Sequence, residues 1–304
     1  SALRALLANR YTTSPAVMEE GRLFPDGLLA AASGGMLPRP NIWNAALWCA
    51  ILIGGACAGC QLLRKNDHWN PFPYDQPCGQ LVIHSDTPLR DHQRLIEELV
   101  TQREWINSRL SLTPSDKPIH VYLYGDEAEY YKFLNLRFPE MATRRAIFVG
   151  TNTDLTVYAH WGDQVAVDLR HEVAHGYLHA AVPNLPLWLD EGLAEYFEVG
   201  RGRRGYNEAH VEMLIKQAES GTWRPDLARL ETLTSAADMT QQDYAESWAW
   251  VHYMLEAEDG KSEVLTSYLT DLTTHPNAEL LSARIAKRLV GPELALGEHI
   301  RTLR

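Results

Sequence analysis

Residues 171–196 read HEVAHGYLHAAVPNLPLWLDEGLAEY, and this stretch carries the clearest chemical pattern in the chain. It begins with His171-Glu172-Val173-Ala174-His175, which places two histidines four residues apart. On a helix such residues share one face, about 6 Å apart along the axis, so both imidazoles can reach one tetrahedral metal ion. Glu172 then lies beside the metal, where it can take a proton from a metal-bound water. The pattern predicts Zn2+ bound by His171 and His175, with Glu172 as general base.

A catalytic zinc site needs a third protein ligand and one open position. Glu191 follows His175 after fifteen residues, within the helical segment WLDEGLAEY (188–196). Glu191 and Glu195 are four residues apart and share a helix face. One of them can bind the metal while the other accepts a hydrogen bond from a ligand imidazole and fixes its tautomer.

HEVAH followed by WLDEGLAEY resembles the gluzincin metallopeptidases, and most closely an uncharacterised bacterial, planctomycete-type gluzincin-like family, over about residues 81–255. The resemblance implies a zincin-like fold and peptide-bond hydrolysis. It also implies that Glu191 is the third zinc ligand and that Glu195 is the carboxylate that accepts a hydrogen bond from a ligand imidazole. The connector between His175 and Glu191 is shorter than in the better-known members, which predicts a more open site.

A hydrolytic site also needs a donor to the developing oxyanion. The segment YAESWAWVHYML (244–255) resembles the aminopeptidase N segment whose tyrosine has this role, which implies Tyr244 as the donor. The alternatives are Tyr196, Tyr206, His210 and His252. His179 is too far from His171, about 12 Å along a straight helix, to share its zinc ion, and we expect it in a pocket or at the surface.

The pattern of elements predicts an α+β fold. Apolar and alternating segments predict strands at 81–84, 119–124, 146–150 and 155–160. Helical periodicity predicts helices at 89–110 and 127–136 and, beyond Asp163, helices alone at 163–182, 188–199, 207–219, 242–257, 261–272 and 278–289. We therefore expect an N-terminal mixed-sheet lobe with the active-site helix (81–182) and an all-helical lobe (183–304).

The gluzincin resemblance implies that a strand before the active-site helix borders the cleft and pairs with extended substrate, and 146–150 and 155–160 are the candidates. Residues 146–150 hold no carboxylate, so the exopeptidase signature is absent and an endopeptidase is favoured. Arg144, Arg145 and Arg170 are expected to face solvent, the alternative being carboxylate binding.

The chain carries 28 Lys and Arg against 39 Asp and Glu, a net charge of −11. Such a balance lacks the basic footprint of a nucleic-acid-binding protein, and we expect no nucleic-acid partner. Three of the four cysteines, at 49, 57 and 60, fall in one apolar segment, so no disulfide framework is expected.

The apolar segment that contains these three cysteines predicts that the protein is exported. The run AALWCAILIGGACAG (45–59) is short for a membrane span and suits a signal peptide. Cys57-Ala58-Gly59-Cys60 resembles a bacterial lipobox, with Cys60 as the lipidated residue. We expect an extension or untranslated segment (1–35), a signal peptide with lipobox (36–60) and a linker (61–80). A cleaved secretory peptide and an uncleaved anchor helix (42–63) are the alternatives.

Together these observations predict a zinc-dependent metallopeptidase of the bacterial cell envelope, an exported lipoprotein acting on peptide or protein substrates. The alternatives are a catalytically dormant gluzincin-fold binding protein and a metallohydrolase of non-peptide amides. A binding protein has no need of Glu172, whereas sequence alone does not separate the two hydrolases.

The lipobox is testable by one substitution. Cys60→Ser should abolish acyl labelling and release the protein from the membrane fraction, because the acyl chains are the anchor. Metabolic labelling with a fatty-acid analogue and cell fractionation measure both effects. Unchanged retention in the variant would favour the anchor helix.

Overall fold

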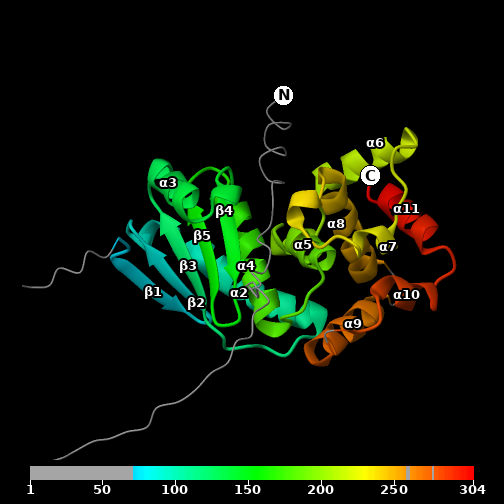
Figure 1. Ribbon diagram of the computed structural model, residues 1–304, viewed down its shortest axis with the longest axis horizontal. Helices are drawn as coiled ribbons and strands as arrows, with labels where there is room; N and C mark the ends of the chain where they lie inside the picture. Colours follow the sequence, from blue (N-terminus) through cyan, green and yellow to red (C-terminus); the bar gives the residue numbers. More distant parts are fainter. Residues whose placement is uncertain (1–70, 258–260, 276) are drawn as a thin grey trace, which may run out of the picture. The chain divides into compact units, whose positions relative to one another are not determined.

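The computed structural model describes residues 71–257, 261–275 and 277–304 (Figure 1). In this part of the chain one mixed sheet has the strand order β1-β2-β3-β5-β4. Its strands are β1 (Tyr74–Cys78), β2 (Leu81–Ser85), β3 (Ile119–Tyr124), β4 (Ala146–Gly150) and β5 (Leu155–His160). Strands β2, β3 and β5 run parallel, whereas β1 and β4 pair antiparallel at the two edges.

Alternating side chains give the sheet two faces. On one face Ile119, Val121 and Leu123 are buried in the main core, together with residues of α2 (Gln93–Leu110) and α4 (Val165–Ala181). On the other face, Ile147 packs with residues of α3 (Glu127–Arg137) in a smaller cluster. The Asp126 side chain caps α3 by accepting hydrogen bonds from two backbone N–H groups, as expected for an N-cap aspartate.

The remaining helices form the second lobe, which confirms the α+β architecture. They are α5 (Leu187–Phe197), α6 (Glu208–Glu219), α7 (Leu227–Leu230), α8 (Gln241–Glu256), α9 (Ser262–Thr274), α10 (Leu281–Ala286) and α11 (Pro292–Thr302). Helix α8 is central, because residues 243–255 are all buried and α5, α6, α7, α9 and α11 pack around it.

The site lies where the two lobes meet. Helix α4 packs on β3, β4 and β5 and also contacts α5, which in turn packs on α8. Figure 1 shows β4 as the strand closest to the helical lobe. Sheet, α4, α5 and α8 therefore form one continuous stack, and the ligands predicted from the sequence sit on its two middle helices.

Three elements differ from the sequence prediction, namely strand β1, the short helix α7 and helix α11. Residues 74–78, within the predicted linker 61–80, form strand β1. Proline is tolerated there because β1 is an edge strand, and Pro77 lies opposite Val82 of β2. Helix α11 was not predicted, although Gly291-Pro292 is a typical helix start, with proline in the first turn. The predicted extension, signal peptide and lipobox, and residues 61–70, lie outside the described residues.

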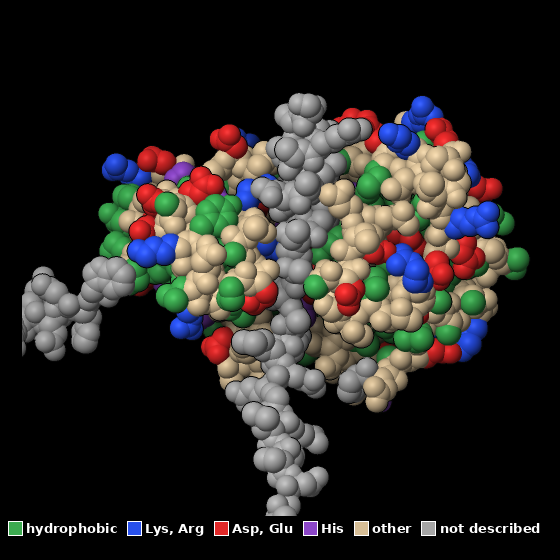
Figure 2. All heavy atoms as spheres, turned by 45° about the horizontal axis from the view of Figure 1, so that its top comes forward, with side chains coloured by type: hydrophobic (Ala, Val, Ile, Leu, Met, Phe, Trp, Pro, Cys, Tyr) green, Lys and Arg blue, Asp and Glu red, His purple; other side chains and the backbone are tan. Residues whose placement is uncertain are grey.

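The surface of the described residues carries both charge signs. Figure 2 shows Lys and Arg side chains interspersed with Asp and Glu over the face in view. Within the described ranges, no helix has the length and apolar character needed to cross a membrane.

Gly192 tests the close approach of α5 and α8. A Cβ at this position would lie 2.5 Å from the backbone oxygen of Ser247 in α8. Gly192→Ala should therefore lower the free energy of unfolding by about 1–3 kcal/mol, the usual cost of overpacking. Gly297→Ala in α11 is the matched control, because its Cβ would meet only the end of Arg301 at 3.9 Å. Gly297→Ala should raise the free energy of unfolding by about 0.5–1 kcal/mol, because alanine favours a helix more than glycine does. Urea denaturation measures both changes, and a Gly192→Ala protein as stable as wild type would contradict the packing argument.

Candidate metal centre

Three acceptor atoms from two helices converge on one point. Helix α4 carries His171 and His175 on one face, and their Nε2 atoms lie 3.2 Å apart. Helix α5 contributes Glu191, whose Oε2 lies 3.6 Å from Nε2 of His171 and 3.7 Å from Nε2 of His175. His175 and Glu191 are almost completely buried, whereas the His171 side chain is 15 % exposed. The three predicted ligands thus form a group that could hold a metal ion.

Two further carboxylates orient the imidazole rings. Nδ1 of His171 lies 3.1 Å from Oε2 of Glu198, and Nδ1 of His175 lies 2.8 Å from Oδ1 of Asp190. A carboxylate accepts a hydrogen bond from Nδ1, so this network assigns the Nδ1–H tautomer to each neutral ring. The lone pair of each Nε2 then faces Glu191. Such outer carboxylates fix ring orientation and raise the basicity of the ligand nitrogen.

The electrostatics favour positive charge at this point. Burial opposes protonation of His171, but the carboxylates of Glu191 and Glu198 beside its two ring nitrogens hold its pKa well above the usual value. The pKa of His175 is also raised, since Asp190 outweighs the effect of burial. The pKa of Glu191 is lowered, because the two imidazoles outweigh its own burial. A proton or a metal cation placed between these three acceptor atoms would reduce the repulsion among them.

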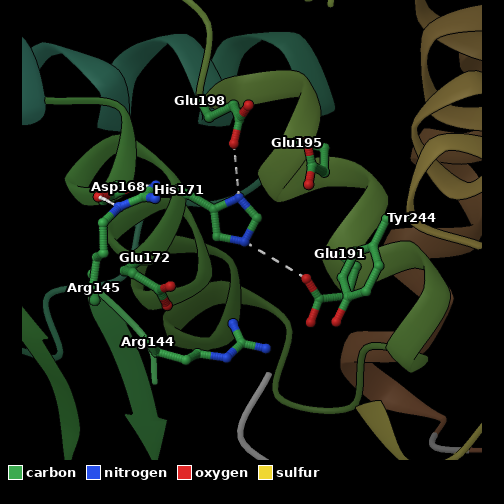
Figure 3. Close-up of a pocket in the computed structure, with 10 residues that line it drawn as sticks. Arg144, Arg145, Asp168, His171, Glu172, Glu191, Glu195, Glu198 and Tyr244 are labelled. Carbon is green, nitrogen blue, oxygen red and sulfur yellow. Dashed lines mark hydrogen bonds and ion pairs between the residues drawn. The ribbon is translucent and has the colours of Figure 1, made fainter. Parts of the chain in front are cut away.

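Glu172 lines the same pocket but does not belong to the group of His171, His175 and Glu191. Figure 3 shows its carboxylate apart from the contact between His171 and Glu191. Burial raises the pKa of its carboxyl, only partly offset by the positive charges of His171, His175 and Arg144. A carboxylate whose pKa is raised toward neutrality is a more effective general base than an ordinary one.

The pocket has a volume of about 30 Å³, enough for one or a few water-sized groups. Figure 3 shows Glu172 and Arg144 entering it from one side, with Glu191 and Tyr244 on the other. Its ten lining residues are Arg144, Arg145, Ala146, Asp168, His171, Glu172, Glu191, Glu195, Glu198 and Tyr244. The sequence-predicted residues His171, Glu172, Glu191, Glu195 and Tyr244 are therefore assembled around one space, and Nε2 of His175 lies 3.2 Å from Nε2 of His171.

Tyr244 enters the pocket from the start of α8. Its side chain is 2 % exposed and packs with Met239, Leu187 and Leu233. The capping box of Thr240 and Asp243 fixes the helix start immediately before it. The phenol is thus held rigidly at the pocket wall.

The carboxylates that contact Nδ1 of His171 and His175 are those of Glu198 and Asp190, whereas Glu195, which was predicted to make such a contact, pairs with His210. Oε2 of Glu195 lies 2.9 Å from Nε2 of His210 and also accepts from the Asn207 side chain. A signal for Glu198 was present in the sequence, because Glu198 follows Glu191 by seven residues, two helical turns on the same face. Asp190 is the residue directly before Glu191, and no helical spacing in the sequence pointed to it.

The other candidate residues have different partners. Oδ2 of Asp190 lies 2.9 Å from Nε2 of His179, which lines a separate groove with Phe148 and Leu187. The Tyr196 hydroxyl donates to Glu256, and His252 pairs with His299. These contacts engage Tyr196 and His252, and His210 pairs with Glu195. Tyr206, the remaining alternative to Tyr244, lines a different pocket together with Arg203 and His252.

The expectation that three arginines face solvent was wrong. Arg145 makes two hydrogen bonds of 2.8 and 2.7 Å to the carboxylate of Asp168. Arg170 donates to the backbone oxygen of Glu198 and to the Glu98 side chain. Arg144 is 6 % exposed and lines the pocket. The burial of these three arginines is decided by neighbours that are distant in the sequence, and the local composition around each arginine does not indicate which neighbours those are.

The sheet topology decides between the two candidate strands. Strand β5 lies between β3 and β4, whereas β4 is an edge strand. Ala146 at its start belongs to the pocket, and Phe148 stacks on His175 at a ring separation of 5.9 Å. Of the two, β4 is the strand that borders the site.

The comparisons with known proteins locate similarity in the same region. Residues 165–278, from the first residue of α4 to beyond α9, match a family model described as "Protein of unknown function (DUF1570)". The matched segment contains His171, Glu172, His175, Glu191 and Tyr244. Arg144 and the strands lie outside it. No curated protein matches the chain.

Asp190 provides a test of the outer carboxylates. Asp190→Asn removes the charge that orients His175 and should lower metal affinity by about 10–100-fold, as is usual for such partners. Asp116→Asn, at a fully exposed side chain, is the control and should leave the affinity unchanged. Competition with a chromogenic chelator measures both. Wild-type affinity in Asp190→Asn would show that the Nδ1 contact does not support the ligand.

Proposed function

We propose that this protein is a zinc-dependent peptidase in which His171, His175 and Glu191 hold the metal and Glu172 is the general base. The observation that carries the proposal is the convergence of the two histidine Nε2 atoms and Oε2 of Glu191 on one point. The buried carboxylate of Glu172 lies beside this point without being one of the three ligands. The apolar run and lipobox-like Cys57–Cys60 support a site of action in the bacterial cell envelope.

The size of the acceptor triangle suits zinc. A point equidistant from the corners of a triangle with sides of 3.2, 3.6 and 3.7 Å lies about 2.0 Å from each. Zinc is bound by histidine nitrogen and carboxylate oxygen at about 2.0–2.2 Å. Two imidazoles and one carboxylate are also a ligand set that catalytic zinc sites use, with the remaining position left to water or substrate.

The chemistry follows from the residues around that point. Zinc bound there would supply Lewis acidity, lowering the pKa of a water molecule and polarising a carbonyl group. The Glu172 carboxylate accepts the proton of the attacking water and delivers it to the leaving amine. The Tyr244 hydroxyl donates a hydrogen bond to the oxygen on which negative charge develops.

An extended peptide would reach these groups along β4. The outer edge of this strand has backbone N–H and C=O groups that can pair with a substrate strand. Such pairing binds any peptide backbone and supports a peptide or protein as substrate over other amides. A groove at the far end of β4, lined by Phe148, Gly150 and Leu187 among others, offers room for the chain beyond the pocket.

Substitutions at Glu172 and Glu191 distinguish the proposed general base from the proposed metal ligand. Glu172→Gln preserves volume and should leave zinc content unchanged, while kcat falls by about 10²–10⁴-fold or more, because the base is lost. Glu191→Gln should lower both zinc affinity and rate, since it changes a metal ligand. Zinc analysis paired with peptide-library cleavage measures these effects on the wild type and both variants. Cleavage by Glu172→Gln at the wild-type rate would refute the mechanism.

Tyr244→Phe tests the oxyanion donor in the same assay. The variant keeps the buried ring and should bind zinc normally, while kcat falls by about 10²–10³-fold. An unchanged rate would assign the oxyanion contact to another group. A wild-type protein that binds zinc but cleaves no peptide in the library would favour a dormant binding protein or a hydrolase of other amides.

A further inference from the structure

A groove larger than the metal pocket lies further along strand β4. It has a volume of about 700 Å³, whereas the pocket has about 30 Å³. Its walls come from the second half of β4, the end of α4, the loop before α5 and residues 231–234. Its apolar lining includes Phe148, Leu155, Ala180, Leu185, Leu187 and Leu233.

The register of β4 relates this groove to the pocket. Ala146, Phe148 and Gly150 alternate along the strand and therefore face the same side. Ala146 lines the pocket, and Phe148 and Gly150 line the groove. Because an extended chain rises about 3.3 Å per residue, the two ends of this face lie about 13 Å apart. A peptide that pairs with β4, an edge strand of the described sheet, would thus reach from pocket to groove in about four residues.

Gly150 shapes the far end of the groove. A Cβ at this position would lie 3.0 Å from the Phe148 ring, closer than most Cβ contacts in proteins. A larger residue would therefore press on this ring. The ring in turn contacts the imidazole of His179, with the two centroids 5.3 Å apart.

Two sets of contacts join the groove to residues of the metal pocket. Nε2 of His179 lies 2.9 Å from Oδ2 of Asp190, and Oδ1 of the same carboxylate lies 2.8 Å from Nδ1 of His175. Leu187 of the groove packs against the cluster that contains Tyr244. A group bound in the groove would therefore touch side chains that support a proposed metal ligand and the proposed oxyanion donor.

The charged groups of the groove have partners within the protein. Asp190 lies between two histidines, and Glu231 accepts a hydrogen bond from the backbone of Ser282. Nζ of Lys117 lies 3.3 and 3.1 Å from the backbone oxygens of residues 151–152. A charged substrate side chain would have to compete with these contacts, whereas an apolar side chain needs only the apolar walls. The groove therefore favours an apolar occupant.

We propose that this groove binds a large apolar side chain of the substrate, about four residues from the bond that is cleaved. The inference rests on the proposed peptidase function and names its substrate class, extended peptides with Leu, Ile, Phe or Met at this distance. Removal of such a side chain from water should favour binding by about 10–100-fold. Because remote binding energy can also place the reacting groups, kcat should rise together with affinity.

The test places one leucine at different positions in a peptide. The host is a twelve-residue peptide of alternating Ala and Ser, acetylated and amidated, and Leu replaces each residue in turn. Asp and Lys at the same positions are the charged controls. Mass spectrometry locates the cleaved bond, initial rates give kcat and KM, and calorimetry measures binding to the zinc-loaded Glu172→Gln protein.

Two substitutions change the groove itself. Ala180→Trp fills it, and Leu185→Asp places a negative charge in its wall. Ala128→Trp, at an exposed position of α3, is the matched control. Each is made alone for kinetics and together with Glu172→Gln for binding. Zinc content and melting temperature report whether each variant is folded.

We expect wild type to cleave about four residues from Leu wherever Leu stands, with kcat/KM about 10–100-fold above that of the host peptide. Ala180→Trp should lose most of this preference, and Leu185→Asp should favour Lys over Leu at the same distance. Ala128→Trp should keep the wild-type preference. The affinities measured by calorimetry should follow the same order.

Two results would overturn the proposal. One is equal cleavage and equal binding of the Leu peptides and the host by wild type. The other is a preference for Leu that both groove variants retain, which would place the apolar subsite elsewhere. If wild type cleaves none of the peptides, the peptidase proposal fails. The calorimetric preference for Leu, and its loss in Ala180→Trp, then decide alone whether the groove binds an apolar side chain.

Discussion

The structure depends on bringing three electron-rich atoms to one buried point. Two nitrogens on α4 and one oxygen on α5 lie within 3.7 Å of one another, an arrangement that is unfavourable unless a cation or protons occupy the centre. Helix geometry fixes the two nitrogens relative to each other. The oxygen, however, depends on how closely α5 packs between α4 and α8, and Gly192 beside the ligand permits that approach. The geometry of this candidate metal site is thus set by helix packing as much as by the three side chains themselves.

The carboxylates of the site differ in chemistry because their surroundings differ. Glu191 faces two imidazoles, and its pKa is lowered despite its burial, which keeps its carboxylate ionised beside them. Glu172 is also buried, but nearby positive charge offsets its burial only in part, and its pKa is raised. Environments that push the pKa values of two neighbouring acids apart are typical of sites that use one as a charge and the other as a proton carrier.

The sequence predicted the parts of this site that follow a helical repeat. The spacing of His171 and His175 gave their convergence, and the strands from 81 to 160 and most of the helices were located from hydrophobic periodicity. Contacts between elements remote in sequence were not predictable in this way. Asp190 faces His175 across two helices, and Arg144 enters the pocket because a fork between Arg145 and Asp168 holds its backbone. Strand β1 was missed because its proline and polar residues are tolerated only at an edge, a property of the sheet and not of the segment.

The core of the described residues runs without interruption from Leu81 of the sheet to Ile300 of the last helix. Polar contacts cross the same boundary: the Gln102 side chain in α2 donates to the backbone of both α4 and α5, and Glu256 of α8 accepts from Arg109 of α2 and Tyr196 of α5. Two lobes that share one core do not behave as separate folding units, so loss of either one removes the packing of the other. The protein should therefore unfold in a single cooperative transition, and access to the pocket has to come from side chains and loops at its rim, because hinge opening of the lobes would expose the common core to water.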